Sequence, residues 1–345
     1  MKMKSTWVTR RAPLGDVVWQ PVQYPTVGDL LLCEVISIGI HGRVETAVGA
    51  RHRLYPGDRI ICSLGNRYAT ALLDAVAEVS SDQIDLISAS GLCGTVISRA
   101  KKATNPTRLR LLGQAFVGGI PLNLRTCTLT PVASGIGEPQ WVVVVGSTMD
   151  SGKTTACTSI VHGLVSAGHR VGAGKVTGTA SARDVGSMRD AGADPAVDFL
   201  DFGWPSTAGC SDAELLHVLK SVADTIRVSD VDFGVLEIAD GLLQCDTRFL
   251  LSRLSSQLGA RAQLVLTVRE SLSAVAGVEL LGECALDVVA VSGIITNSPL
   301  LCREVELASP VPCIPTSQLG PYVAGIDQRL GPFAAVAAQG GAVRA

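Results

Sequence analysis

The stretch Trp141-Val-Val-Val-Val-Gly-Ser-Thr-Met-Asp-Ser-Gly-Lys-Thr-Thr155 decides the fold of this chain. It opens with a valine-rich apolar run, typical of a buried strand, and continues into a loop bounded by Gly146 and Gly152. A helix is expected to begin at Lys153. The backbone N–H groups of such a loop and the positive end of the helix face one point, where an anion is held. The stretch therefore predicts a loop that wraps a polyphosphate.

Particular roles follow from this pattern. We predict that Lys153 adds a point charge at the β- and γ-phosphates and that the Thr154 hydroxyl reaches Mg²⁺. Five residues separate Gly146 from Gly152, whereas the common pattern has four residues between its glycines. The predicted nucleotide-binding residues of the loop are Gly146, Ser147, Thr148, Met149, Asp150, Ser151, Gly152, Lys153, Thr154 and Thr155.

The composition is that of a globular protein with a large core. Of the 345 residues, 47% are hydrophobic and 17% charged, which is enough apolar material for two domains. No apolar run reaches the roughly 18 residues of a membrane span, and no apolar segment follows the lysines of the first five residues. We therefore expect a cytoplasmic protein with neither a membrane span nor a secretory signal.

The ten cysteines are scattered along the chain. None forms a Cys-x-x-Cys pair, and no histidine lies near one at metal-ligand spacing. The spacing therefore predicts small buried hydrophobic residues and no Cys/His metal cluster.

Two domains are expected, one spanning residues 1–139 and the other residues 140–345. Short β-branched runs at 29–38, 42–48 and 59–64 alternate with turns, which predicts a smaller, mainly-β domain of barrel or sandwich type. The turn-rich stretch 133–139 is the predicted boundary.

From Trp141 onward, strands alternate with amphipathic helices, the pattern of an α/β domain with a parallel sheet covered by helices on both faces. The clearest helix spans 212–226, with apolar residues along one side. Ligands of such sheets bind at the carboxyl ends of the strands. The expected strands are 141–146, 170–175, 231–237, 262–267, 286–295 and 311–315, with an acidic strand at 198–201.

Charged residues follow two of these strands. Lys175 ends the second strand, and a lysine there is costly to bury unless it meets an anion. Glu237 ends the strand 231–237 and Asp240 comes shortly after it, so a carboxylate at this edge can anchor Mg²⁺. Asp184 is a further candidate ligand of the metal.

Residues 140–320 resemble the dethiobiotin synthetase family of phosphate-loop enzymes. The shared features are the loop spacing with Asp150, Lys175 before the small-residue loop 177–180, Asp184, Glu237, and Gly293-Ile-Ile-Thr-Asn297 after a late strand. The resemblance implies a P-loop NTPase sheet and an ATP- and Mg²⁺-dependent ligase that activates a small carboxylate or carbamate by phosphoryl transfer, for ring or amide formation with an amine. It also implies catalytic roles for Lys153 and Lys175, magnesium ligation by Thr154, Asp184 and Glu237, and adenine recognition by Asn297.

Other readings stay open. The basic segment Arg99–Arg110 contains no acidic residue and favours, as an alternative, a polynucleotide 5′-kinase that grips nucleic acid phosphates. A phosphate-loop nucleotide switch is a third class, although residues 147–149 lack the second lysine that such switches usually carry. Residues 1–139 hold a substrate, recruit a partner or build an oligomer such as a homodimer. No membrane partner is expected.

Overall fold

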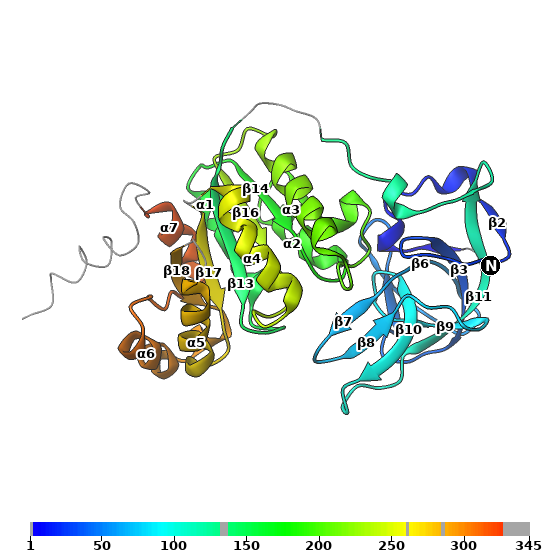
Figure 1. The fold of residues 1–345 in the computed structure, drawn as a ribbon, viewed down its shortest axis with the longest axis horizontal. Coiled ribbons are helices and arrows are strands. Elements are labelled where there is room, and N and C mark those ends of the chain that lie inside the picture. The colour runs from blue at the N-terminus through cyan, green and yellow to red at the C-terminus, as the bar shows by residue number, and fades with distance from the viewer. Residues whose placement is uncertain (1–2, 132–136, 260–261, 284–286, 327–345) are drawn as a thin grey trace, which may run out of the picture. The chain divides into compact units, whose positions relative to one another are not determined.

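The computed structural model describes residues 3–131, 137–259, 262–283 and 287–326. These residues form two compact units (Figure 1). Unit 1 comprises Met1–Thr130 together with Gly178–Gly186 and Asp198–Ser211, and unit 2 comprises the remainder of the chain. Two short segments of the second half of the sequence therefore fold with the N-terminal half. Of the predicted boundary stretch 133–139, residues 133–136 lie outside the described residues.

Unit 1 is built on a β-sheet that closes on itself. The sheet order is β1-β6-β3-β11-β9-β10-β8-β7, and β6 also pairs with β10, so that β6, β3, β11, β9 and β10 form a ring. Most pairings are antiparallel, which confirms the predicted mainly-β domain. The strands are β1 (Lys4–Ser5), β2 (Val18–Gln20), β3 (Leu30–Ser37), β4 (Arg43–Glu45), β5 (Arg51–Arg53), β6 (Arg59–Leu64), β7 (Arg67–Ala69), β8 (Leu73–Val76), β9 (Gln83–Leu86), β10 (Leu92–Arg99), β11 (Thr107–Val117) and β12 (Ile120–Pro121).

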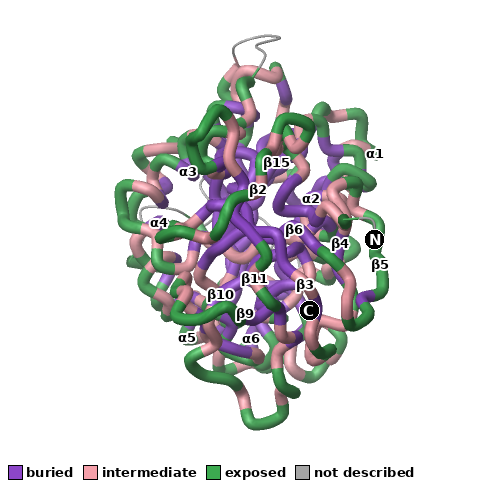
Figure 2. Tube along the Cα trace, turned by 90° about the vertical axis from the view of Figure 1, so that its right-hand side faces the viewer, coloured by how far each residue is buried: buried purple, intermediate pink, exposed green. Residues whose placement is uncertain are grey.

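The core of unit 1 lies inside this ring of strands. Alternate residues of β3, including Leu31, Cys33 and Val35, point inward and meet Ile60 and Cys62 of β6. Figure 2 shows buried residues along β6, β3 and β11 and exposed residues at the outer turns. The period-two alternation of the sequence is the cause, because successive strand side chains point to opposite faces. Short 3-10 helices also lie in unit 1: η1 (Trp7–Thr9), η2 (Leu14–Asp16), η3 (Leu124–Thr126) and η4 (Phe199–Phe202).

Unit 2 holds a six-stranded sheet whose order is β15-β14-β16-β13-β17-β18. The pairings among β13, β14, β16, β17 and β18 are all parallel, as predicted for an α/β domain. The expected strand at 311–315 is wrong: only Cys313 forms an isolated bridge, to Val291. The acidic strand expected at 198–201 is the end of β15 followed by η4. The strands are β13 (Gln140–Gly146), β14 (Val171–Lys175), β15 (Ala196–Asp198), β16 (Phe233–Glu237), β17 (Gln263–Thr267) and β18 (Asp287–Ser292).

Helices cover the sheet on both faces. In Figure 1, α3 and α4 lie together on one side, while α1 and α7 pack against each other on the other. The predicted apolar side of α3 is buried, and Gly174 in β14 leaves room for Val222 of that helix. The helices are α1 (Lys153–Ser166), α2 (Ala182–Asp190), α3 (Asp212–Arg227), α4 (Cys245–Leu258), α5 (Ser271–Gly282), α6 (Pro299–Ala308), α7 (Leu319–Ala324), and the 3-10 helices η5 (Ile294–Asn297) and η6 (Thr316–Gln318).

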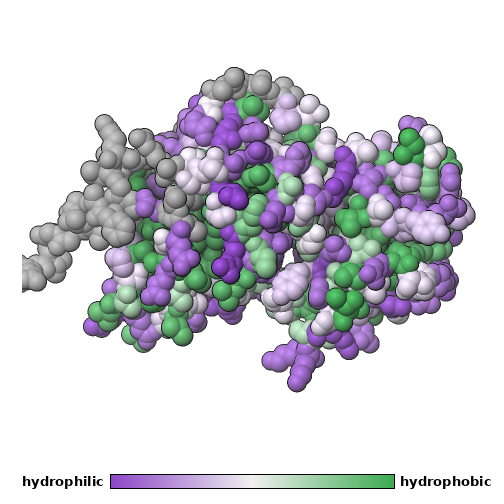
Figure 3. All heavy atoms as spheres, viewed as in Figure 1, coloured by the Kyte–Doolittle hydropathy of each residue, from purple (hydrophilic) through white to green (hydrophobic). Residues whose placement is uncertain are grey.

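The surface is mixed in character. On the face that Figure 3 shows, hydrophobic and hydrophilic residues are interspersed in each unit. Scattered apolar residues of this kind are normal for a folded chain. Within the described ranges, every helix is too short or too polar to cross a membrane.

Candidate nucleotide-binding site

The site lies where the strand order of unit 2 reverses. The chain leaves β13 for β14 on one side of the sheet and later adds β17 and β18 on the other side of β13. In open α/β sheets, ligands bind in the crevice outside the carboxyl ends of the strands at this reversal. The loop 147–152 leaves β13 at that point and leads directly into α1.

The loop presents its backbone N–H groups. Asp150 has a φ of 59° and Gly152 a φ of 106°, and such left-handed residues turn successive N–H groups toward a common centre. Among the residues that the structure describes, the N–H groups from Thr148 to Thr155 have no hydrogen-bond acceptor. The last of these belong to the first turn of α1, whose N–H groups lack partners within the helix. This row of unused donors fits a bound phosphate chain.

Residues at the end of β17 and just after it hold the loop in place by hydrogen bonds. The Ser147 N–H donates to the Thr267 carbonyl at the end of β17, at 2.9 Å. The Thr267 hydroxyl donates to the Val145 carbonyl at 3.1 Å, so the fully buried Ser151 hydroxyl, 2.8 Å away, donates to it. The Arg269 guanidinium donates to the Asp150 carbonyl at 3.0 Å. Sequence reasoning missed both residues, although Thr267 ends the predicted strand 262–267 and Arg269 follows two residues later.

The Lys153 ammonium lies between the loop and the segment that follows β16. Its ammonium donates to the Thr148 carbonyl at 2.9 Å and to the Asp240 carbonyl at 2.7 Å, and the side chain is buried. Burial lowers the pKa of Lys153, while the nearby carboxylates of Glu237 and Asp240 act in the opposite direction. A desolvated ammonium that donates to two carbonyls gains from an anionic ligand. The geometry therefore suits the predicted role of Lys153 at a phosphate.

Lys175, Glu237 and Thr154 come together beside the loop. Lys175 and Glu237 are register partners on β14 and β16, and the lysine nitrogen lies 3.6 Å from Glu237 Oε1. The Thr154 hydroxyl donates to the same oxygen at 3.2 Å. Neighbouring oxygen ligands of an octahedral Mg²⁺, each about 2.1 Å from the ion, lie about 3 Å apart. The hydroxyl and the carboxylate therefore fit adjacent positions on Mg²⁺.

Two predicted site residues, Asp184 and Asn297, remain to be placed. Asp184 is in the first turn of α2, within the segment that belongs to unit 1, so its part in metal binding stays a prediction. Asn297 is exposed at the end of η5. The turn before it touches the phosphate loop, because the Ile294 N–H donates to the Ser151 carbonyl at 3.2 Å. Adenine recognition by Asn297 also stays a prediction.

Three cysteines meet in unit 1, contrary to the expectation of no cluster. Cys33, Cys62 and Cys93 stand on neighbouring strands, and their sulfur atoms lie within 4.8 Å of one another. Sequence spacing cannot reveal this contact because strand pairing creates it. All three are fully buried, and burial raises the pKa of the Cys62 thiol well above its usual range. Burial in the core agrees with the predicted packing role.

A parallel sheet of this order, with the loop 147–152 between β13 and α1, gives unit 2 a P-loop-like α/β fold. No family model and no curated protein matches the chain. Several solved structures show distant similarity to the chain. They include a signal recognition particle receptor FtsY from Elizabethkingia anophelis, with 20% identity, 46% of this chain and 51% of that chain covered, and a TM-score of 0.32.

A DUF1611 family protein from Anabaena variabilis is also similar, with 13% identity, 60% and 63% of the two chains covered, and a TM-score of 0.38. A complex of the Elizabethkingia FtsY with GDP gives 14% identity, 58% and 68% coverage, and a TM-score of 0.35. The chain thus spans between about half and about two thirds of the length of these structures. Similarity at this level carries no conclusion about what this chain binds.

The close approach of Gly241 to the loop gives a first prediction. A Cβ on residue 241 would lie 2.8 Å from the Ser147 carbonyl oxygen and 3.2 Å from Thr148 Cα, so Gly241→Ala must displace the loop. We expect it to weaken nucleotide binding on the order of tenfold to a hundredfold, the loss of one or two charge-assisted hydrogen bonds from the N–H groups of the loop. Calorimetric titration measures the loss.

Gly282→Ala is the matched control because a Cβ there meets nothing within 4 Å. It should leave nucleotide binding unchanged. Equal affinity in the two variants would mean that the position of the loop does not govern binding.

Proposed function

We propose that this chain is a Mg-ATP-dependent enzyme of ligase type, which transfers the γ-phosphoryl group to a small carboxylate or carbamate and so activates it for attack by an amine. The observation that carries the proposal is the second buried lysine. Lys175 is 7% exposed and stands on the strand next to β16, with Glu237 between it and the phosphate loop. A site that only binds a nucleotide needs no more than the loop and Lys153, so the second lysine supports a role in a reaction.

The charges support a transfer reaction. Lys153 and Lys175 are both buried, and the Lys175 nitrogen lies 3.6 Å from Glu237 Oε1, so two cations stand beside the loop. Negative charge accumulates where the transferred phosphoryl group and an anionic acceptor meet, and preorganised cations stabilise it there. We assign Lys153 to the phosphoryl oxygens and Lys175 to the side of the acceptor.

The proposed reaction proceeds in two steps. An oxygen of the acceptor carboxylate attacks the γ-phosphorus, and the bond from that phosphorus to the bridging oxygen of ADP breaks. The amine nitrogen then attacks the acyl carbon, loses a proton, and inorganic phosphate leaves. Thr154 and Glu237 would hold Mg²⁺, which when bound neutralises charge on the β- and γ-phosphates. The N–H groups of the loop hold the β-phosphate in place.

A small acceptor is favoured over a polynucleotide. Two arginines of the basic segment already have carboxylate partners on the sheet of unit 1: Arg108 pairs with Asp85 at 2.8 Å, and Arg110 pairs with Glu34 at 3.1 Å. Ion-paired arginines contribute less to the binding of a phosphate backbone, which depends on unneutralised charge.

Release of ADP tests the proposal. We expect Mg-ATP turnover to depend on one member of a panel of small carboxylic acids and amines. Lys175→Met should reduce this dependent turnover on the order of 10²- to 10³-fold while ATP still binds. Lys220→Met, an exposed lysine of α3, is the control and should be unaffected. Turnover that depends on RNA 5′-ends, or that is equally fast without any acceptor, would contradict the proposal.

A further inference from the structure

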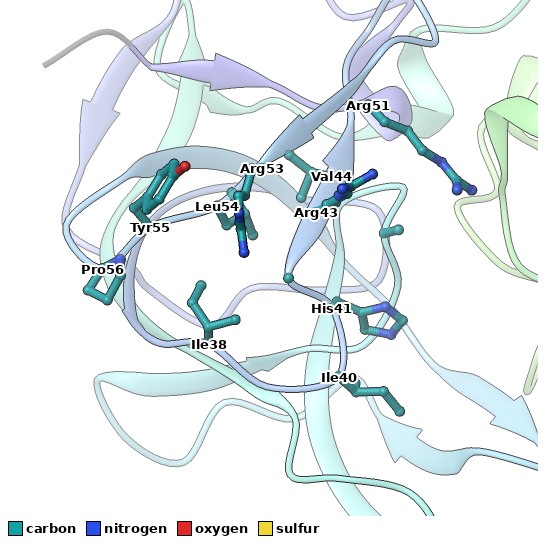
Figure 4. Close-up of a pocket in the computed structure, with 12 residues that line it drawn as sticks. Ile38, Ile40, His41, Arg43, Val44, Arg51, Arg53, Leu54, Tyr55 and Pro56 are labelled. Carbon is teal, nitrogen blue, oxygen red and sulfur yellow. The ribbon is translucent and has the colours of Figure 1, made fainter.

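Unit 1 contains a pocket of about 740 Å³, within the size range of small-molecule sites. It lies beside the two-stranded ribbon formed by β4 and β5, which is separate from the closed sheet. Figure 4 shows side chains from both strands of the ribbon and from the adjoining turns around the cavity. None of these residues belongs to unit 2 or to the phosphate loop.

Two arginines stand at paired positions on this ribbon. Arg43 of β4 and Arg53 of β5 are directly opposed in the antiparallel register, and both line the pocket. Like charges in directly opposed positions destabilise a strand pair. Within the described part of the chain, no carboxylate lies within ion-pair distance of either guanidinium. Arg53 extends into the space between Tyr55 and Ile38 (Figure 4).

The nearby acidic residues already have partners. Glu45 pairs with Arg51 at 3.3 Å, and its other carboxylate oxygen accepts from the Ala182 N–H at 2.8 Å. Asp58 pairs with Lys4. Since neither carboxylate lines the pocket, the charge that the cavity presents is positive.

A third arginine, Arg51, also lines the cavity but already pairs with Glu45, and the remaining lining is apolar or neutral. Ile38, Val44 and Leu54 line the cavity, and the Tyr55 ring lies 5.9 Å from the Arg53 guanidinium. Burial and the neighbouring Arg67 lower the pKa of His41 to about 4, so this histidine is uncharged at neutral pH. The cavity therefore combines two guanidinium groups that have no described carboxylate partner, those of Arg43 and Arg53, with an apolar wall.

We propose that this pocket binds a small organic oxyanion, a carboxylate or phosphate group joined to an apolar body. The oxyanion lies between Arg43 and Arg53, because guanidinium groups match carboxylate and phosphate in a bidentate geometry and a shared anion removes their mutual repulsion. The apolar body lies against Ile38 and Leu54. The proposal is independent of the function proposed for unit 2.

Calorimetric titration of the full chain tests this site. The probes are phenyl phosphate, phthalate and inorganic phosphate at low ionic strength; the first two distinguish a phosphate from a carboxylate ligand. We expect phenyl phosphate or phthalate to bind, and inorganic phosphate to bind more weakly than phenyl phosphate. Arg43→Gln and Arg53→Gln should each weaken binding on the order of tenfold to a hundredfold, because each removes charge-assisted hydrogen bonds. Neither variant should lower Tm, since each relieves a like-charge pair.

Two controls separate this pocket from other sites. Arg59→Gln removes an exposed arginine of unit 1 that does not line the pocket, and it should bind the probe unchanged. Lys153→Ala should also bind it unchanged. Loss of binding in Lys153→Ala, unchanged binding in both pocket variants, or no heat from any probe would overturn the proposal. An oligonucleotide that binds with a steep salt dependence and is released by Arg43→Gln would replace the small ligand with a nucleic acid.

Discussion

Lys153→Ala should abolish nucleotide turnover while the chain stays folded. The side chain places the ammonium beside the loop 147–152, at 2.9 Å from the Thr148 carbonyl and 2.7 Å from the Asp240 carbonyl. No described side chain makes the same pair of contacts in its place. Removing one preorganised charge from a transition state costs on the order of 10²- to 10³-fold in rate.

The stability of the same variant is a separate expectation. The pKa of Lys153 in the folded chain is lowered by burial. A lysine whose folded pKa lies below its unfolded value destabilises the fold at pH 7, where the unfolded chain binds the proton more readily. Removal of the ammonium relieves this cost, which offsets the two lost hydrogen bonds. We therefore expect Tm to stay the same or to rise slightly.

Steady-state ADP release and thermal unfolding measure the two effects. Lys220→Ala, an exposed lysine in the same unit, is the matched control and should keep full activity. Undiminished turnover in Lys153→Ala would remove the assignment of this loop to the phosphates. A large fall in Tm would instead give Lys153 a structural role.

The parts of the site that could be predicted are those formed by residues close together in the sequence. The valine run and the two glycines predict β13, the loop and α1, because each depends on contacts within a few residues. Lys175 and Glu237 were also predictable, since a charged residue ending an apolar strand must lie at the carboxyl edge of a parallel sheet.

Contacts between distant segments were not predictable. The Ser151 hydroxyl donates a hydrogen bond to Thr267, which is 116 residues away in the sequence. The position of the loop requires a glycine at residue 241, because a Cβ there would be too close to the loop backbone. Cys33, Cys62 and Cys93 meet only because their strands become neighbours in a closed sheet. The opposition of Arg43 and Arg53 depends on the register of a ribbon that sequence reasoning placed only as one strand run at 42–48.

A buried ion network in unit 1 gives the second large prediction. Arg10 lies 2.7 Å from Asp198 and 2.9 Å from Asp201, and these side chains are 10%, 2% and 5% exposed. The two aspartates cap η4, because Asp198 accepts from the backbone of Leu200 and Asp201. Arg10 therefore neutralises the buried Asp198 and shares Asp201 with Arg11, whose side chain is 36% exposed and lies 2.6 Å from that carboxylate. These segments lie 188 residues apart in the sequence, so the network ties the N-terminus to the segment 198–211.

Arg10→Met should lower the free energy of unfolding by about 3–5 kcal/mol at pH 7, the usual cost of breaking a buried ion pair. Urea denaturation measures the loss. Arg110→Met removes a half-exposed partner of Glu34 in the same unit and should cost at most ~1 kcal/mol. If the two variants lose the same free energy, the buried network does not stabilise the fold.

The pH dependence of the loss identifies its cause. Burial already raises the pKa of Asp198, and Arg10 opposes this rise, so Arg10→Met should raise that pKa further. A carboxyl group whose folded pKa exceeds the unfolded value, about 3.9, makes the folded state bind the extra proton, so stability increases as pH falls through the raised pKa. The variant should therefore recover part of its loss between pH 7 and pH 4. Asp198→Asn, added to Arg10→Met, should give the same recovery at pH 7. The free energy lost in Arg10→Met could instead stay constant with pH and persist after the second substitution. That outcome would assign the loss to missing contacts with Trp7, whose ring lies 4.4 Å from the guanidinium, and would contradict uncompensated charge as its cause.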